Sequence, residues 1–326
     1  MDAITPRPPA SPGVRELLDK YHLRPRKGLG QNFLADPNIL RKIVEAADLT
    51  PEATVLEIGP GLGMLTRFLS QAAGRVVAVE LDEALFGLLR QELADLSNLE
   101  LVQGDILQLD PAKLAEGRKL KVKGQTPNDE GQIGGQRSAV SSQRAAVSDQ
   151  QPSTFNLQPS ILPYTAVANL PYYITSAAIR HLLEASPPPQ RIVLTVQREV
   201  AERIVAAPGD LSLLAVSVQF YGRPRIVARI PAGAFVPPPK VDSAVVRIDT
   251  HPAPPVEVRD VETFFRVVRA GFGQKRKQIK NSLAAGLGLS GDEAAAALAR
   301  AGIDPRRRAQ TLSLAEWAGL VHEIYR

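Results

Sequence analysis

The sequence predicts an α/β fold, in which a mainly parallel sheet is covered by helices on both faces and a small all-helical region follows. Three observations lead to this prediction. Short apolar runs alternate with segments of helical periodicity between residues 37 and 248. A glycine-rich turn follows the first run, and the pattern beyond residue 258 has helical spacing only. Parallel strands read as nearly unbroken apolar runs because both of their faces are buried.

The expected strands are mostly aliphatic runs of four to eight residues bounded by turn residues. They occupy residues 54–58, 75–80, 99–103, 165–168, 191–196, 213–220 and 243–248, with an aromatic and proline-rich connection between the last two. Helices are expected between them at residues 37–47, 64–72, 82–94, 176–184 and 199–205. Asp36 and Pro37 give the first of these helices an N-cap and a first-turn proline.

Composition divides the chain into further parts. The proline-rich residues 1–20 predict a disordered tail, and residues 21–250 predict the α/β domain. Within that domain, residues 117–160 are rich in glutamine, serine and glycine, and we interpret them as a flexible insert. A proline-rich linker at about 250–258 leads to a helical domain over residues 251–326. Its helices are expected at 261–271, 276–285, 292–301 and 314–325.

The composition excludes several classes of site. The 326 residues include no cysteine, which excludes disulfides, a thiol nucleophile and cysteine-ligated metals. The four histidines are scattered without metal-ligand spacing, so no metal is expected. No apolar run approaches the roughly 20 residues that span a membrane, and the first residues do not resemble a signal peptide. We therefore expect a cytoplasmic protein without a membrane partner.

Charge is distributed unevenly along the chain. Residues 45–116 contain 13 acidic and 4 basic residues, whereas residues 264–308 contain 10 basic and 3 acidic ones. A basic excess confined to one part indicates a polyanion partner held by that part. A solvated helical surface explains the same charges, so both interpretations stay open.

The sequence Asn169-Leu170-Pro171-Tyr172 follows the strand expected at residues 165–168. An amide oxygen at Asn169 and the carbonyl of Leu170 can accept hydrogen bonds from an NH₂ group, and proline restricts the residue before it. The ring of Tyr172 can stack on a flat base. These groups suit chemistry on the exocyclic amine of a nucleobase.

A second set of candidates marks a cofactor site. Gly59-Pro60-Gly61-Leu62-Gly63 follows a strand and opens a helix, but Met64 stands one position after the last glycine, so the dinucleotide fingerprint fails. This departure favours S-adenosylmethionine over NAD. Glu80 ends the second strand and can accept both ribose hydroxyls, while Asp105 follows the third and can accept an adenine amine. A helix N-terminal charge and a turn residue are the structural alternatives for these two carboxylates.

Taken together, these motifs resemble the ribosomal RNA adenine dimethyltransferase family, in particular its bacterial small-subunit type. The resemblance covers about residues 22–326 except the insert. It rests on Lys27-Gly28-Leu29-Gly30-Gln31-Asn32-Phe33-Leu34, the stretch from Glu57 to Gly63, Gly104-Asp105, Asn169 to Tyr173, and Phe235 to Ser243. The fold that it implies is a Rossmann-like S-adenosylmethionine-dependent methyltransferase sheet.

The resemblance implies roles for residues of this chain. The S-adenosylmethionine site would include Asn32, Leu34, Gly59, Gly61, Glu80, Asp105 and Asn169. The catalytic set would be Asn169, Leu170, Pro171, Tyr172 and Phe235, with the target base between the two aromatic rings. We expect Phe235 in a rigid exposed loop, because three prolines follow it closely. Candidate phosphate contacts are Lys240, Arg269, Lys275, Arg276, Lys277 and Lys280, which would position RNA without reading bases.

The activity that the resemblance implies is N6,N6-dimethylation of two adjacent adenosines in the 3′-terminal hairpin loop of 16S rRNA. The partner would be the immature small ribosomal subunit late in its assembly, and the enzyme would be a monomer. Two alternatives remain: the related large-subunit methyltransferase that confers macrolide resistance, and an RNA-binding assembly factor without catalysis. An NAD dehydrogenase is disfavoured because the chain lacks a hydride-handling His/Arg/Asp set.

Overall fold

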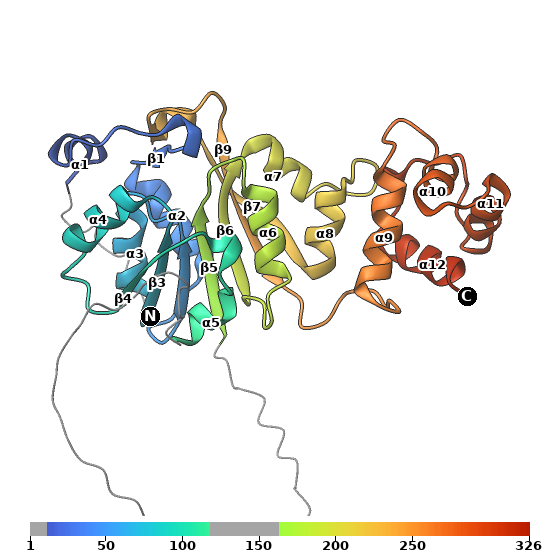
Figure 1. Cartoon of the computed structure of the whole chain (residues 1–326), viewed down its shortest axis with the longest axis horizontal. Helices are drawn as coiled ribbons and strands as arrows, with labels where there is room; N and C mark the ends of the chain where they lie inside the picture. Colours follow the sequence, from blue (N-terminus) through green and yellow to red (C-terminus); the bar gives the residue numbers. More distant parts are fainter. Residues whose placement is uncertain (1–11, 118–162) are drawn as a thin grey trace, which may run out of the picture.

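The computed structural model describes residues 12–117 and 163–326 (Figure 1), so most of the insert expected at 117–160 lies outside the described residues. Its centre is a seven-stranded sheet in the order β4-β3-β2-β5-β6-β9-β7. These strands are β2 (Thr54–Ile58), β3 (Arg75–Glu80), β4 (Leu99–Gln103), β5 (Tyr164–Asn169), β6 (Arg191–Gln197), β7 (Gly222–Ile230) and β9 (Ser243–Thr250). The expected α/β fold with a Rossmann-like sheet is confirmed.

The order in which the chain adds strands to the sheet reverses at the centre of the sheet. β4, β3, β2, β5 and β6 are parallel, whereas β9 is antiparallel to β6 and to β7. The chain builds outward from β2 through β3 to β4, and then returns to place β5 on the other side of β2. Open α/β sheets bind ligands at the carboxyl ends of strands where the order reverses. That point lies between β2 and β5.

Alternating residues along each strand face two different helical layers. Val55 and Val167 contact α2 (Pro37–Ala47) and α3 (Met64–Ala72) on one face. Leu56 and Ala166 belong to the core cluster that includes side chains of α5 (Pro111–Glu116), α6 (Thr175–Leu183) and α7 (Arg198–Ile204) on the other. Helix α2 begins where the sequence places a cap. Asp36 accepts a hydrogen bond from the Asn38 backbone at 2.8 Å, as expected for the first turn of α2.

The strand expected at residues 213–220 is wrong, because this segment forms helix α8 (Leu213–Tyr221). Ser212 caps the helix by accepting from the Ala215 backbone, and the helix is buried on two sides. A short apolar run with no polar face does not distinguish a buried strand from a buried helix. The strand comes next, as edge strand β7, where an aromatic and proline-rich connection was expected. Along β7, exposed residues such as Arg223 and Arg225 alternate with half-buried residues.

The disordered tail expected over residues 1–20 is also wrong in its second half. Residues 14–20 form helix α1 (Val14–Lys20), which buries Val14, Leu17 and Leu18. These side chains pack against α4 (Glu83–Glu92), and Lys20 forms an ion pair with Glu92 at 2.6 Å. Residues 1–11 lie outside the described residues. Three apolar residues in seven are too few to predict a helix unless the surface that they cover is known.

The C-terminal helices are α9 (Val261–Phe272), α10 (Ile279–Leu287), α11 (Gly291–Arg300) and α12 (Leu314–Ile324). They gather around their own hydrophobic core, which includes the fully buried Trp317, at the far end of the molecule from α1 and α4 (Figure 1). Helix α8 joins this core to the sheet, since Phe220 stacks on Phe264 at 4.8 Å while Val218 packs on the sheet side. No helix in the described ranges is long and apolar enough to cross a membrane.

Candidate active site

One cavity opens at the carboxyl ends of the central strands. It is formed by the turns after β2, β3, β4 and β5, together with the two-residue strands β1 (Phe33–Leu34) and β8 (Phe235–Val236). Every residue predicted for cofactor binding or catalysis lines it, namely Asn32, Leu34, Gly59, Gly61, Glu80, Asp105, Asn169, Leu170, Pro171, Tyr172 and Phe235. The sheet brings these side chains together because its parallel strands end at the same edge.

The glycine turn after β2 requires glycine at two positions. Gly61 has φ +60°, and a Cβ atom there would lie 3.1 Å from the ring of Phe33. Gly63 has φ +78°, and its Cβ would lie 2.9 Å from Leu93. Other residues resist such φ values. The backbone of the turn can therefore approach a ligand closely.

Glu80 and Asp82 form the acidic side of the cavity. The two oxygens of Glu80 accept hydrogen bonds from the backbone N–H groups of Asp82 at 2.9 Å and Gly61 at 3.1 Å. Burial of this carboxyl, which is 6% exposed, raises its pKa. Asp82 accepts from the Gln31 side chain at 2.9 Å and pairs with Arg26 at 3.2 Å. These bonds fix the glycine turn to β3 and fasten the N-terminal segment across the cavity.

Asp105 has a structural role in its own turn and also lines the cavity. Its Oδ1 accepts from the Leu107 backbone at 3.0 Å, which caps the short turn after β4. Asp105 is therefore a turn residue, which was its structural alternative, but only one of its two oxygens takes part in the turn. The other oxygen remains available to a ligand in the cavity that this residue lines.

Glu57 is a cavity residue to which the sequence reasoning assigned no role. It lies in β2, is 1% exposed, and its Oε2 has no hydrogen-bond partner among the described residues. Burial raises the pKa of this carboxyl to about 8, against a weaker lowering effect of the nearby Thr66 hydroxyl. A glutamate inside the apolar run Val55-Leu56-Glu57-Ile58 was the available signal. A charge in a strand buried on both faces needs a reason.

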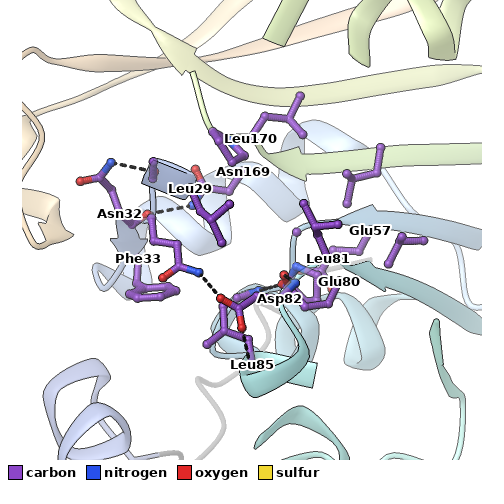
Figure 2. Close-up of a pocket in the computed structure, with 18 of the residues that line it drawn as sticks. Leu29, Asn32, Phe33, Glu57, Glu80, Leu81, Asp82, Leu85, Asn169 and Leu170 are labelled. Carbon is purple, nitrogen blue, oxygen red and sulfur yellow. Dashed lines mark hydrogen bonds between the residues drawn. The ribbon is translucent and has the colours of Figure 1, made fainter. Parts of the chain in front are cut away.

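Asn169 and Leu170 lie across the cavity from Glu80 and Asp82 (Figure 2). The side-chain nitrogen of Asn169 donates to the Asn32 carbonyl at 3.4 Å, which leaves its Oδ1 free to accept. In the described part of the chain, no group donates to the Leu170 carbonyl either. The sequence after β5 thus presents two unused acceptors from adjacent residues.

The two aromatic residues are placed differently. The hydroxyl of Tyr172 is 2.8 Å from the Ser243 hydroxyl at the start of β9, which fixes the half-buried ring. Phe235 is not in an exposed loop, and that expectation is wrong. It is 3% exposed because β8 pairs with β1, opposite Leu34, and packs into the core while one side faces the cavity. The prolines after it, from Pro237 on, are largely exposed.

The basic candidates lie away from this cavity. Lys240 is exposed in the loop before β9, and Arg269 is exposed on α9. Lys275, Arg276 and Lys277 form an exposed turn between α9 and α10, with Lys280 in the first turn of α10. Helix α10 begins at Ile279, three residues later than expected, so the three turn residues are not on a helix. No cluster of histidine, aspartate or glutamate in the described residues is arranged to hold a metal.

Comparisons with known proteins agree on one family. The family model described as "Ribosomal RNA adenine dimethylase" matches residues 22–325. A relative from Dehalococcoides mccartyi named "Ribosomal RNA small subunit methyltransferase A" is 42% identical over 315 residues, covering 97% of this chain and 94% of its own. A relative of the same name from Pelotomaculum thermopropionicum is 43% identical and covers 95% of each chain.

Two solved structures share the fold over nearly the whole chain. The crystal structure of the 23S rRNA methyltransferase ErmE has a TM-score of 0.62 at 27% identity, and covers 90% of this chain and 100% of its own. A dimethyladenosine transferase from Plasmodium falciparum has a TM-score of 0.64 at 21% identity, with coverage of 90% and 97%. The second likeness is one of fold alone.

Proposed function

The chain belongs to the ribosomal RNA adenine dimethylase family, and we propose that it dimethylates the N6 amines of two adjacent adenosines in the 3′-terminal hairpin loop of 16S rRNA. Support for a small-subunit target comes from the curated relatives, which are named for that subunit and are 42–43% identical over almost the full length. The 23S rRNA methyltransferase is similar at 27% identity. We propose that the enzyme acts as a monomer on the immature subunit, late in its assembly and in the cytoplasm.

The cavity fits S-adenosylmethionine as the methyl donor. Glycines with positive φ allow close backbone approach at Gly59 and Gly61, and Glu80 keeps a free lone pair on each oxygen for ribose hydroxyls. Asp105 keeps one oxygen for the adenine amine. The unpartnered Oε2 of the buried Glu57 can form a hydrogen bond with a ligand in the cavity. When bound, S-adenosylmethionine supplies a methyl group on a cationic sulfur, which the adenosine amine displaces.

The observation that carries the proposal is the pair of unused acceptors at Asn169 Oδ1 and the Leu170 carbonyl. Each can accept one proton of an exocyclic NH₂ group. The lone pair of such an amine is delocalised into the ring, so two hydrogen bonds that draw its protons aside make it a better nucleophile. Catalysis is then mostly positioning, which can supply about 7–11 kcal/mol of a barrier.

The aromatic side chains hold the base. Tyr172 is held by its hydrogen bond to Ser243, and Phe235 is immobilised by the pairing of β8 with β1. We propose that the target base enters between the two rings after it leaves the RNA stack. Each stacking contact contributes about 1–3 kcal/mol. The amine loses its proton after methyl transfer, so no histidine or cysteine base is needed in the cavity.

The decisive experiment is transfer of labelled methyl from S-adenosylmethionine to small ribosomal subunits from a strain that lacks the modification. Nuclease digestion and mass spectrometry should find dimethyladenosine, and primer extension should place it in the 3′-terminal hairpin. Large subunits are the matched control. Methylation of large subunits alone would replace the proposal with the large-subunit activity. Cofactor binding without transfer to either subunit would support an assembly factor instead.

A further inference from the structure

A second hollow lies on the outer side of α6, between α6, α7, α8 and α9, and we call it the α6–α9 groove. Figure 1 shows α6, α8 and α9 side by side between the sheet and the last three helices, α10 to α12. Its polar and charged lining includes Ser176, Arg180, Arg203, Ser217, Tyr221 and Arg269. None of these residues lines the active-site cavity.

The groove carries a surplus of positive charge. Three arginines from three different helices face it, and one glutamate, Glu184, makes the net charge +2. Arg180 is paired with Glu184 at 2.8 Å. Arg203 and Arg269 are exposed and have no hydrogen bond or ion pair within the described residues. Guanidinium groups that converge from separate helices match phosphate oxygens, which they bind in a bidentate manner.

The floor of the groove is apolar and aromatic. Tyr221 stacks on Phe265 with ring centroids 5.9 Å apart and an interplanar angle of 17°. Its hydroxyl has no hydrogen-bond partner in the described part of the chain, although the residue is half-buried. Leu213, at the other end of α8, lines the same groove and is 37% exposed. A surface with a ring, an aliphatic side chain and an unused hydroxyl accepts a nucleobase and its sugar better than it accepts water.

At the start of α6, residues that line the groove and the active-site cavity are close to one another in the sequence. Helix α6 starts at Thr175, immediately after the catalytic sequence, so that Ile174 lines the cavity and Ser176 lines the groove. Two residues span at most about 7 Å of backbone. The start of α6 therefore borders both the cavity and the groove.

We infer that the α6–α9 groove is a second RNA subsite, which binds the phosphate and base of an unpaired nucleotide flanking the target adenosine. This inference rests on the proposed RNA substrate and adds a place for the neighbouring nucleotide. Arg203 and Arg269 hold the phosphate, while Tyr221 contacts the base. Single-stranded RNA is recognised in this way, by cationic side chains along the backbone and stacking surfaces beside them.

The first test removes the two unpaired arginines. Arg203→Ala/Arg269→Ala is compared with Arg15→Ala/Arg90→Ala, a control that removes the same charge from exposed sites on α1 and α4. Binding of both variants to unmethylated small subunits is measured between 50 and 200 mM salt. We expect the slope of log K against log[salt] to flatten by about 1.4 in the groove variant, since each lost single-strand phosphate contact accounts for about 0.7. Slopes and affinities equal to those of the control would overturn the inference.

The second test uses the absence of cysteine in the chain. Ser217→Cys places a unique thiol in the groove, and Ser97→Cys places one in the exposed segment between α4 and β4 as the control. An iron chelate attached to either thiol cleaves nearby RNA by hydroxyl radicals, and primer extension maps the cuts. We expect cuts flanking the methylated adenosines from position 217 and none there from position 97.

Cuts from position 217 elsewhere in the rRNA would overturn the inference. So would cleavage of a ribosomal protein without cuts in the RNA, which would make the groove a protein-docking site. The failure of the proposed function has a different signature, because the wild-type enzyme would then transfer no methyl to small subunits. Thermal unfolding and cofactor affinity of each variant establish that it is folded.

Discussion

The active-site cavity and the α6–α9 groove hold charge in opposite ways. In the cavity, carboxylates are buried and fixed, as Glu80 is by the backbone N–H groups of Gly61 and Asp82. In the groove, Arg203 and Arg269 are exposed and unpaired among the described residues. A fixed and dehydrated site recognises one compact ligand, whereas exposed cations recognise any chain of phosphates. Single substitutions should therefore be severe in the cavity and mild on the basic surface.

The largest effect is expected from Asn169→Ala. Loss of an amide that orients the reacting amine should lower the rate of methyl transfer by about 10²–10³-fold, the usual cost of one preorganised hydrogen bond. Affinity for small subunits should change much less, because one neutral side chain contributes little to phosphate binding. Single-turnover kinetics and equilibrium binding of RNA and of S-adenosylmethionine separate the three quantities. Equal losses in rate and RNA affinity would contradict the orienting role.

Glu57→Gln tests the buried acid of the cavity through stability. With a pKa of about 8 in the folded state and 4.5 as its ordinary value, Glu57 keeps its proton on folding while the unfolded chain loses it. Folding stability should therefore fall as pH rises from 4.5 towards 8, by up to about 1.4 kcal/mol per pH unit. Glu57→Gln should lack this component. Denaturant unfolding from pH 5 to pH 8 measures it, with the exposed Glu83→Gln as control. Parallel pH curves for wild type and Glu57→Gln would refute the prediction.

Two substitutions of Tyr172 distinguish the stacking of its ring on a base from the hydrogen bond of its hydroxyl to Ser243. Tyr172→Ala should lower kcat/KM by the value of one stacked base, about 1–3 kcal/mol. Tyr172→Phe keeps the ring and loses only the hydrogen bond to Ser243, which costs about 1 kcal/mol. Ser243→Ala should reproduce the effect of Tyr172→Phe. If Tyr172→Phe were as impaired as Tyr172→Ala, the ring would have no stacking role.

The smallest effects per residue are expected in the exposed basic turn. Lys275→Ala/Arg276→Ala/Lys277→Ala should weaken RNA binding and flatten its salt dependence by up to about 2, while each single substitution changes the slope by about 0.7. Filter binding to small subunits over a salt series measures both. The methyl-transfer rate at saturating RNA should stay close to that of the wild type. An unchanged salt slope would place the RNA elsewhere on the protein.

The residues of the active-site cavity were easier to predict from the sequence than those of the α6–α9 groove. The positions of Gly59, Glu80, Asp105 and Asn169 follow from local order, because each is the last residue of a strand or lies within two residues of its end. Parallel strands of one sheet end at one edge, so sequence order alone implied that these residues meet. The basic side offered only a charge count over residues 264–308, which does not say which cations face a common groove.

The errors share a physical cause, which is that long-range contacts overrode local patterns. Residues 213–220 form a helix because that helix fills the space between the sheet and α9, where Phe220 meets Phe264. Phe235 is buried because its strand pairs with that of Leu34, which is distant in the sequence, although the prolines after Phe235 are exposed. Helix α1 is held by the surface of α4, which no pattern in residues 14–20 reveals.

The alternating sheet, the glycine turn and the strand-end residues are predictable from the sequence, because periodicity and turn chemistry are properties of neighbours in the chain. The burial that raises the pKa of Glu57, the place of Phe235 between core and cavity, and the groove shared by Arg203 and Arg269 arise only when the chain is folded. Burial and convergence depend on which segments fold against one another. Such contacts join residues far apart in the sequence and leave little trace in the local pattern.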